Sequence, residues 1–180
     1  MANHGVLKLD MVMAKNVDSL NRSAFAGSAT DIDNGYAFQL LTKGSGSSAE
    51  AWVVSAASSA TGDMWMACSP EIPDLVNGTK VYRGLSPDPR DFYNRGGYVF
   101  DAFKPQVGDI ITLSADGISG SPSSGSYVNA VSGSYILAWG AGIASTTLTL
   151  KLIKETYISL ATGAIDDQRE LAYQLEVIAN

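Results

Sequence analysis

The segment 98–118 constrains the fold of this chain more than any other stretch of its sequence. Pro105 has no backbone N–H to donate to a β-ladder, so a first strand is expected to end just before it. Gly and Asp at 108–109 provide a chain reversal, and the residues at 110–113 are largely β-branched and suit a second strand. A second turn follows at 116–117. The segment therefore predicts β-structure with tight turns, in the form of a hairpin, and it contains no nucleophile beside a base and no metal-ligand spacing.

Other short segments with alternating or β-branched apolar residues recur along the chain. A hairpin is expected at 76–82, where an Asn-Gly turn stands just before a β-prone run. The expected strands lie at 6–13, 36–40, 50–54, 64–68, 135–139, 146–152 and 173–178. Tyr173, Leu175 and Val177 should face inward in the last of them. Roughly eight to ten such strands, joined by Ser/Gly-rich loops, are typical of an all-β sandwich or barrel.

We therefore predict one all-β domain over residues 14–180, a β-sandwich or barrel-like fold with Ser/Gly-rich loops. An extended N-terminal arm or strand is expected over residues 1–13. Residues 14–34 are polar and show no clear period, and 85–91 is expected to be a loop because it contains two prolines. A short helical turn is compatible with 92–95.

The composition excludes two classes of partner. Charged residues make up 17% of the chain, its net charge is −6, and Lys and Arg form no run. Nucleic-acid binding requires a basic face that releases counterions, so no nucleic-acid partner is expected. No apolar stretch approaches the length that crosses a bilayer, and no membrane partner is expected. The N-terminus lacks the basic and apolar regions of a signal peptide, which indicates synthesis and folding in a cytoplasm.

Few residues are suited to catalysis or metal binding. Cys68 lies in an apolar alternating run and is expected to be a buried hydrophobe, while His4 is expected in a mobile terminus. One His and one Cys cannot supply the ligands of a zinc site. The segment 31–35 resembles a calcium loop only loosely and is expected to be a turn. The carboxylates at 166–170 are expected to be solvated loop charges, with a hydrolase as a minor alternative. We expect no catalytic residue, cofactor or metal.

Short motifs follow one another between residues 67 and 118. They are Ala-Cys-Ser-Pro-Glu-Ile-Pro (67–73), Asn-Gly-Thr-Lys (77–80), Asp-Phe-Tyr-Asn-Arg-Gly-Gly (91–97), Ala-Phe-Lys-Pro (102–105), Gly-Asp-Ile-Ile-Thr-Leu-Ser (108–114) and Asp-Gly-Ile (116–118). In this order they resemble small proteins encoded beside the major capsid protein of tailed bacteriophages, the head decoration (cement) proteins. The chain departs from the shorter members of that family in its Ser/Gly loop at 119–126 and its β-rich C-terminal third.

The resemblance implies a non-enzymatic structural protein on the exterior of a virion, which binds the capsid and stabilises its shell. Its implied partners are the major capsid protein and further copies of the chain, in a trimer or another homo-oligomer. An alternating edge strand could join a partner's sheet by strand addition. The residues expected to contact the capsid or a second subunit are Leu7, Leu9, Met11, Arg83, Arg90, Phe92, Tyr93 and Arg95.

Two alternatives remain open. A phage tail tube or baseplate β protein would be expected to form rings or tubes alone, whereas a decoration protein should stay soluble until it meets a capsid. A carbohydrate-binding β-sandwich is suggested by Trp52, Trp65 and Trp139, because sugar rings stack on flat aromatic side chains. All three lie in apolar segments, so core packing is their expected role. Exposed coplanar tryptophans would favour sugar binding, and three buried ones would exclude it.

Overall fold

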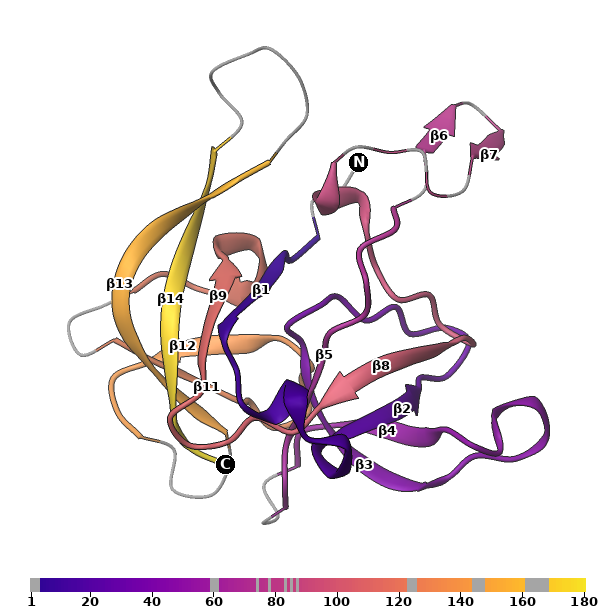
Figure 1. Ribbon diagram of the computed structural model, residues 1–180, viewed down its shortest axis with the longest axis horizontal. Helices are drawn as coiled ribbons and strands as arrows, with labels where there is room; N and C mark the ends of the chain where they lie inside the picture. The colour runs from indigo at the N-terminus through magenta and orange to yellow at the C-terminus, as the bar shows by residue number, and fades with distance from the viewer. Residues whose placement is uncertain are drawn as a thin grey trace.

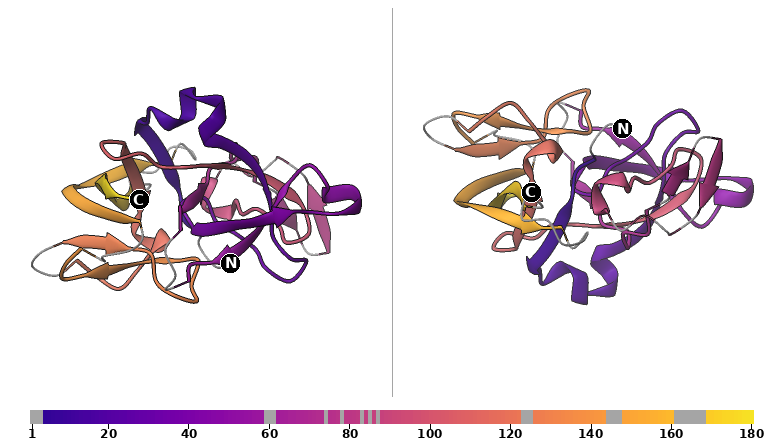
Figure 2. Two further views of the ribbon diagram at one scale, coloured as in Figure 1. Left: turned by 90° about the horizontal axis from the view of Figure 1, so that it is seen from below. Right: turned by 90° about the horizontal axis from the view of Figure 1, so that it is seen from above.

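The computed structural model describes residues 4–58, 62–73, 75–77, 79–82, 84, 86, 88–122, 126–143, 148–160 and 169–180. Over these residues the chain forms strands and five single-turn 3₁₀ helices with no α-helix, so the predicted all-β fold is confirmed. None of the helices described is long and apolar enough to cross a membrane. A seven-stranded sheet and a closed five-stranded barrel lie side by side (Figure 1, Figure 2).

The barrel has the strand order β2-β4-β3-β5-β8. Its strands are β2 (Asn21–Phe25), β3 (Ala37–Lys43), β4 (Trp52–Ala56), β5 (Trp65–Ala67) and β8 (Val99–Phe103). β2 and β4 pair in parallel, and the other neighbouring strands pair antiparallel. In its core the rings of Phe38 and Phe100 meet edge to face at 5.6 Å, an arrangement that aromatic pairs favour. The barrel therefore has an apolar core of its own.

The sheet has the strand order β1-β9-β14-β13-β11-β12-β10. Its strands are β1 (Leu7–Met11), β9 (Ile110–Ser114), β10 (Ile118–Ser119), β11 (Tyr127–Asn129), β12 (Leu137–Gly140), β13 (Thr149–Ser159) and β14 (Arg169–Ala179). β13 and β14 form a long antiparallel pair. Tyr173, Leu175 and Val177 of β14 are buried, as the alternation of this segment predicts.

The remaining elements are short. β6 (Leu75–Asn77) and β7 (Lys80–Tyr82) form the hairpin that the Asn-Gly sequence predicts, and it projects away from both larger units (Figure 1). The 3₁₀ helices are η1 (Ala14–Asn16), η2 (Asp18–Leu20), η3 (Gly46–Ser48), η4 (Pro89–Asp91) and η5 (Ala115–Gly117).

The predicted hairpin around the Gly-Asp turn is wrong in its pairing, although both strands are present. β8 pairs with β2 and β5 in the barrel, whereas β9 pairs with β1 and β14 in the sheet. Asp109 explains the divergence, because its buried carboxylate accepts hydrogen bonds from the backbone N–H groups of Gln106 at 2.8 Å and Met13 at 2.8 Å. The Val177 N–H also donates to the Asp109 carbonyl. These bonds direct the chain out of the barrel and into the sheet.

Three local predictions are corrected. β2 lies within 14–34, where no strand pattern was evident, because Ala24 is its one fully buried side chain. The helical turn is η4 and does not lie at 92–95. The first residue of η4 is a proline, which lacks the N–H group that the start of a helix leaves unpaired, and the Asp88 side chain accepts a hydrogen bond from the Arg90 N–H. Glu170 belongs to β14 rather than to a loop, while 161–168 lie outside the described residues.

Of the two forms predicted for residues 1–13, the described part adopts the strand. β1 pairs with β9, and Val6, Leu7 and Val12 are buried. Burial of aliphatic side chains of this size stabilises the folded chain by about 1.5–3 kcal/mol each. The N-terminal segment is thus part of the core of the sheet.

The sheet and the barrel also meet at Leu113, whose side chain fills a slot between two glycines. A Cβ atom placed on Gly35 would lie 2.5 Å from Leu113 Cδ1, and one placed on Gly117 would lie 2.8 Å from the same atom. Gly35 lies in the turn before β3, which begins at Ala37, so Leu113 of β9 packs against the connection between the barrel strands β2 and β3. The slot therefore requires the absence of side chains at both glycines.

Substitution of Gly35 with alanine is expected to destabilise the fold more than substitution of Gly108 with alanine. Both glycines have left-handed φ angles, +90° and +95°, but only the Cβ at Gly35 meets a neighbouring atom. The shared backbone strain should cost about 1–3 kcal/mol in each variant, and overpacking against Leu113 should add about 1–3 kcal/mol at Gly35. Urea unfolding of the two variants measures the difference, and equal losses would contradict this packing.

Candidate functional site

Two surface grooves lie on either side of the segment Ser69–Ile72, which we name the ridge. The first groove has a volume of about 800 Å³ and runs along β1. The second has a volume of about 520 Å³ and lies beside the segment 92–101. Ser69 and Pro70 line both grooves, so the ridge separates two adjacent hollows.

The predicted contact residues fall mainly into these two grooves. Leu7, Leu9 and Met11 line the first groove, together with Met13. Phe92, Tyr93 and Arg95 line the second groove. Arg90 lines neither, and Arg83 lies outside the described residues.

The first groove follows an open sheet edge. β1 is the terminal strand of the sheet and, among the described strands, pairs with β9 alone. Met11 and Met13 are 62% and 64% exposed, so the groove presents apolar side chains to solvent beside this edge. Glu71 also lines this groove. Burial raises the pKa of its carboxyl, whereas hydrogen bonds with the Asn34 side chain and the Leu7 backbone, and the positive charge of Lys8, act to lower it. An edge of this kind can accept a further strand.

The N-terminus is tied down between the two grooves, which corrects the prediction that His4 is mobile. His4 Nδ1 lies 2.8 Å from a carboxylate oxygen of Asp33, and the Gly5 N–H donates to the other oxygen at 3.0 Å. The His4 ring stacks on Tyr93 at 4.7 Å, and its backbone N–H donates to the Arg90 carbonyl at 3.0 Å. The segment leading into β1 therefore positions an aromatic ring of the second groove.

Reciprocal amide bonds hold the ridge in place. The Asn34 side chain donates to the Ser69 carbonyl at 2.9 Å and accepts from the Ser69 N–H at 3.0 Å. The Asn94 side chain donates to the Ile32 carbonyl at 2.8 Å. These bonds make 31–35 a structural turn, and the described residues contain no group of three or more His, Cys, Asp or Glu side chains that could hold a metal ion.

Two titratable groups near the grooves remain in their neutral forms at neutral pH. Burial, with an added contribution from Asp33, raises the pKa of Tyr36 to about 12. Burial also raises the pKa of the Cys68 thiol, against the opposing effect of Lys15. Cys68 is buried, as predicted, and its environment is unlike that of a reactive thiolate.

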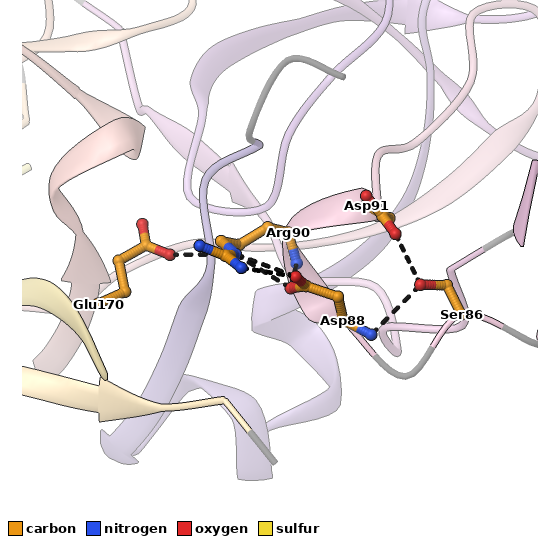
Figure 3. A network of polar contacts seen from close by, with 5 residues as sticks. All are labelled: Ser86, Asp88, Arg90, Asp91 and Glu170. Carbon is orange, nitrogen blue, oxygen red and sulfur yellow. Dashed lines mark hydrogen bonds and ion pairs between the residues drawn. The ribbon is translucent and has the colours of Figure 1, made fainter. Parts of the chain in front are cut away.

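Arg90 joins η4 to the sheet through a chain of ionic contacts (Figure 3). Its guanidinium makes a two-pronged contact with Asp88, with Nη2–Oδ2 at 2.7 Å and Nε–Oδ1 at 3.1 Å. This contact lowers the pKa of the Asp88 carboxyl. On the other side, Arg90 Nε lies 3.8 Å from a carboxylate oxygen of Glu170 in β14. Ser86 supports the loop by donating its hydroxyl to Asp91 at 2.6 Å. The guanidinium of Arg90 thus links η4 to β14 within the same chain.

Glu170 is the least satisfied charge in the described structure. Both of its carboxylate oxygens are buried without a hydrogen bond, and its side chain is 10% exposed. Burial is the main cause that raises the pKa of its carboxyl, and the nearby Asp116 raises it further. Arg90 and the Ser114 hydroxyl act in the opposite direction. Deprotonation of Glu170 therefore places a poorly compensated negative charge inside the fold.

Substitution of Glu170 with glutamine is expected to change how stability depends on pH. A carboxyl whose pKa is raised in the folded state stabilises the fold while it is protonated, and that contribution is lost as the pH rises through the folded-state pKa. The native chain should therefore lose free energy of unfolding, relative to E170Q, from about pH 4.3 upward. Urea unfolding over a pH series measures this. The exposed Glu155→Gln serves as a control that should follow the native curve, and parallel curves for native and E170Q would contradict the argument.

The three tryptophans occupy different environments. Trp65 is buried in the barrel core, and Trp139 packs edge-on against Tyr173 at 4.9 Å beside the core of the sheet. The predicted role in core packing is confirmed for these two. Trp52 belongs to none of the three apolar clusters of the described residues and is half-buried at a surface hollow.

Comparisons of the chain with protein-family models, with curated proteins and with solved structures find no match. The site must be interpreted from its own geometry. Its polar contacts were missed at the sequence level because they join distant segments: His4 and Asp33 are separated by 29 positions, and no local pattern marks the pair. Asn94 and Ser69 carried a signal, since both lie in the motifs of the phage-protein resemblance.

Proposed function

We propose that this chain is a structural protein of a bacteriophage virion that binds the outer surface of the capsid and stabilises the shell. The observation that carries the proposal is the open edge of β1, which lies beside an apolar groove lined by Leu7, Leu9 and Met11. The resemblance of the motif order between residues 67 and 118 supports the major capsid protein as the proposed partner.

The edge of β1 is suited to binding an extended segment. Strand addition supplies main-chain hydrogen bonds, and the apolar side chains that line the groove can supply side-chain contacts. Met11 and Met13 adapt readily to different partner surfaces, because their side chains are unbranched and flexible. The groove thus combines a directional backbone interaction with an adaptable apolar one.

The motifs of the resemblance shape this surface. The ridge contains the Ser-Pro-Glu element. In the Asn-Arg-Gly-Gly element, a Cβ atom added to Gly96 would lie 2.7 Å from the Gly27 carbonyl oxygen. The Gly96 N–H donates to Asp31 at 2.9 Å, which fastens the wall of the second groove to the 31–35 turn. The motifs therefore support a rigid pair of grooves, as expected for a docking surface.

The low charge of the chain also favours a docking role. A weakly charged surface can be covered by a partner without removing water from many ionised groups. Many copies on a capsid lattice gain further from multivalency if the chain also associates with itself, as a trimer or another homo-oligomer. The proposed location of the assembled protein is the capsid exterior.

Replacement of Met11 and Met13 by lysine is expected to weaken capsid binding at least ~10-fold, because unpaired charges would be desolvated in the contact. Both side chains are largely exposed, so the fold should tolerate the change. Co-sedimentation with heads that lack the protein measures the binding, which should saturate at a number set by lattice symmetry. The matched control is Ile153→Lys with Tyr157→Lys, two exposed apolar residues of β13.

Equal effects of the two double variants would contradict the role of the β1 edge. Failure of the native protein to co-sediment with such heads would contradict capsid binding itself. Rings or tubes formed by the isolated native protein, seen by electron microscopy, would favour the tail tube or baseplate alternative.

A further inference from the structure

The barrel gathers several stacking and hydrogen-bonding side chains at one of its ends. β2 and β4 are parallel, and β3 is antiparallel to both β4 and β5, so β2, β4 and β5 all begin at the same end of the barrel. Arg22, Trp52 and Trp65 occupy the first or second positions of these three strands. The end of β3 and the end of β8 reach the same place. Ligand sites commonly lie at the mouths of small barrels.

A hollow of about 480 Å³ lies at this end. It is lined by Arg22, Gln39, Leu41, Trp52, Asp63 and Trp65. The lining thus combines two indole rings with a guanidinium, an amide and a carboxylate. This hollow is separate from the grooves beside the ridge, which share none of these six residues with it.

Trp52 is the more exposed of the two indoles of this hollow. It lies outside the three apolar clusters of the described residues, whereas Trp65 forms part of the barrel core. The Lys43 ammonium lies 5.6 Å from the centre of the Trp52 ring. Lys43 is itself half-exposed; its ammonium donates to the Glu50 carbonyl at 3.0 Å and lies 3.9 Å from the carboxylate of Glu50, a fully exposed side chain. Exposed contacts of this kind hold their geometry weakly, so a ligand can displace Lys43 from the ring.

The polar side of the hollow is better ordered. Arg22 donates to the backbone carbonyls of Asn21 at 2.8 Å and Asp18 at 3.3 Å, and its guanidinium lies 5.6 Å from the centre of the Trp65 ring. Asp63 pairs with Lys104 at 2.6 Å and stays 61% exposed. Its carboxylate can therefore accept hydroxyl hydrogen bonds while Lys104 holds it in place.

We propose that this hollow binds a neutral hexose unit of a glycan, stacked on Trp52 and hydrogen-bonded by Asp63 and Arg22. A hexose has an apolar C–H face and an edge of hydroxyl groups, which matches an indole wall opposite donors and acceptors. The positive and negative groups of the rim favour a neutral ligand over an anion. A nucleobase could also stack here, but the chain offers no basic surface for the attached phosphates. Sugar binding would be additional to the proposed capsid binding and would use other residues.

The test uses the isolated full-length protein with methyl glycosides of glucose, galactose and N-acetylglucosamine and with linear oligosaccharides of each. Tryptophan fluorescence and saturation-transfer NMR report binding. We expect saturable binding of at least one sugar, weakened at least ~10-fold in Trp52→Ala, because stacking on a half-buried indole is lost. Trp139→Phe, which alters a tryptophan in the other unit, should bind as the native protein does.

Asp63→Asn provides a second variant that leaves both indoles of the hollow in place, and it should also weaken binding. A thermal unfolding curve for each variant separates lost binding from lost structure. Absence of saturable binding by every sugar in the panel would overturn the proposal, as would equal affinities of native protein and both hollow variants. Because no capsid is present, neither outcome bears on the proposed docking of β1.

Discussion

Two buried carboxylates hold β1 at its ends, and the arrangement of both units depends on this constraint. Asp33 accepts the Gly5 N–H just before the strand, and Asp109 accepts the Met13 N–H just after it. A buried carboxylate is costly unless it is hydrogen-bonded, so each one favours the conformation in which the N-terminal segment supplies its donors. Asp33 lies in the connection between the barrel strands β2 and β3, and Asp109 lies in the turn by which the chain leaves the barrel for β9. β1 is thereby fastened to the barrel at one end and to the passage from barrel to sheet at the other.

The β1 edge and the aromatic groove are joined by the same contacts. His4 bonds to Asp33 and stacks on Tyr93, while Asn34, the neighbour of Asp33, holds the ridge through Ser69. A partner that shifted β1 would therefore disturb the wall of the second groove as well. Arg90, expected among the contact residues, instead links η4 to Glu170 of β14. The surface left for a partner is mainly apolar and aromatic, with Lys15 as a basic residue of the first groove and Arg95 as one of the second.

The strands could be predicted from the sequence where alternation is local. Leu175 of β14 is buried as its pattern indicates, because the apolar residues of that run recur every second position; Cys68, after β5, is buried at the end of a continuous apolar run. The partners of a strand are set by distant groups. No local pattern shows that the turn at Asp109 is bonded to Met13, so β8 and β9 looked like a hairpin. β2 was missed because its buried side chain is a small alanine among polar neighbours. The site contacts were missed because His4 and Glu170 interact with residues far away in the sequence, and no local pattern marks such pairs.

The position of β1 has a consequence for the order in which the molecule can form during synthesis. Its partner strand, β9, is far away in the sequence. The hydrogen bond that the Val6 N–H, just before β1, donates to the Ser114 hydroxyl spans 108 positions, and the whole barrel lies between. β14, which covers the other side of β9, follows β9 in the chain. β1 must therefore wait without its partner strand until the five barrel strands and then β9 have been made. The barrel, whose strands all lie between residues 21 and 103, can close before that, and the sheet is left to assemble around it as the final step.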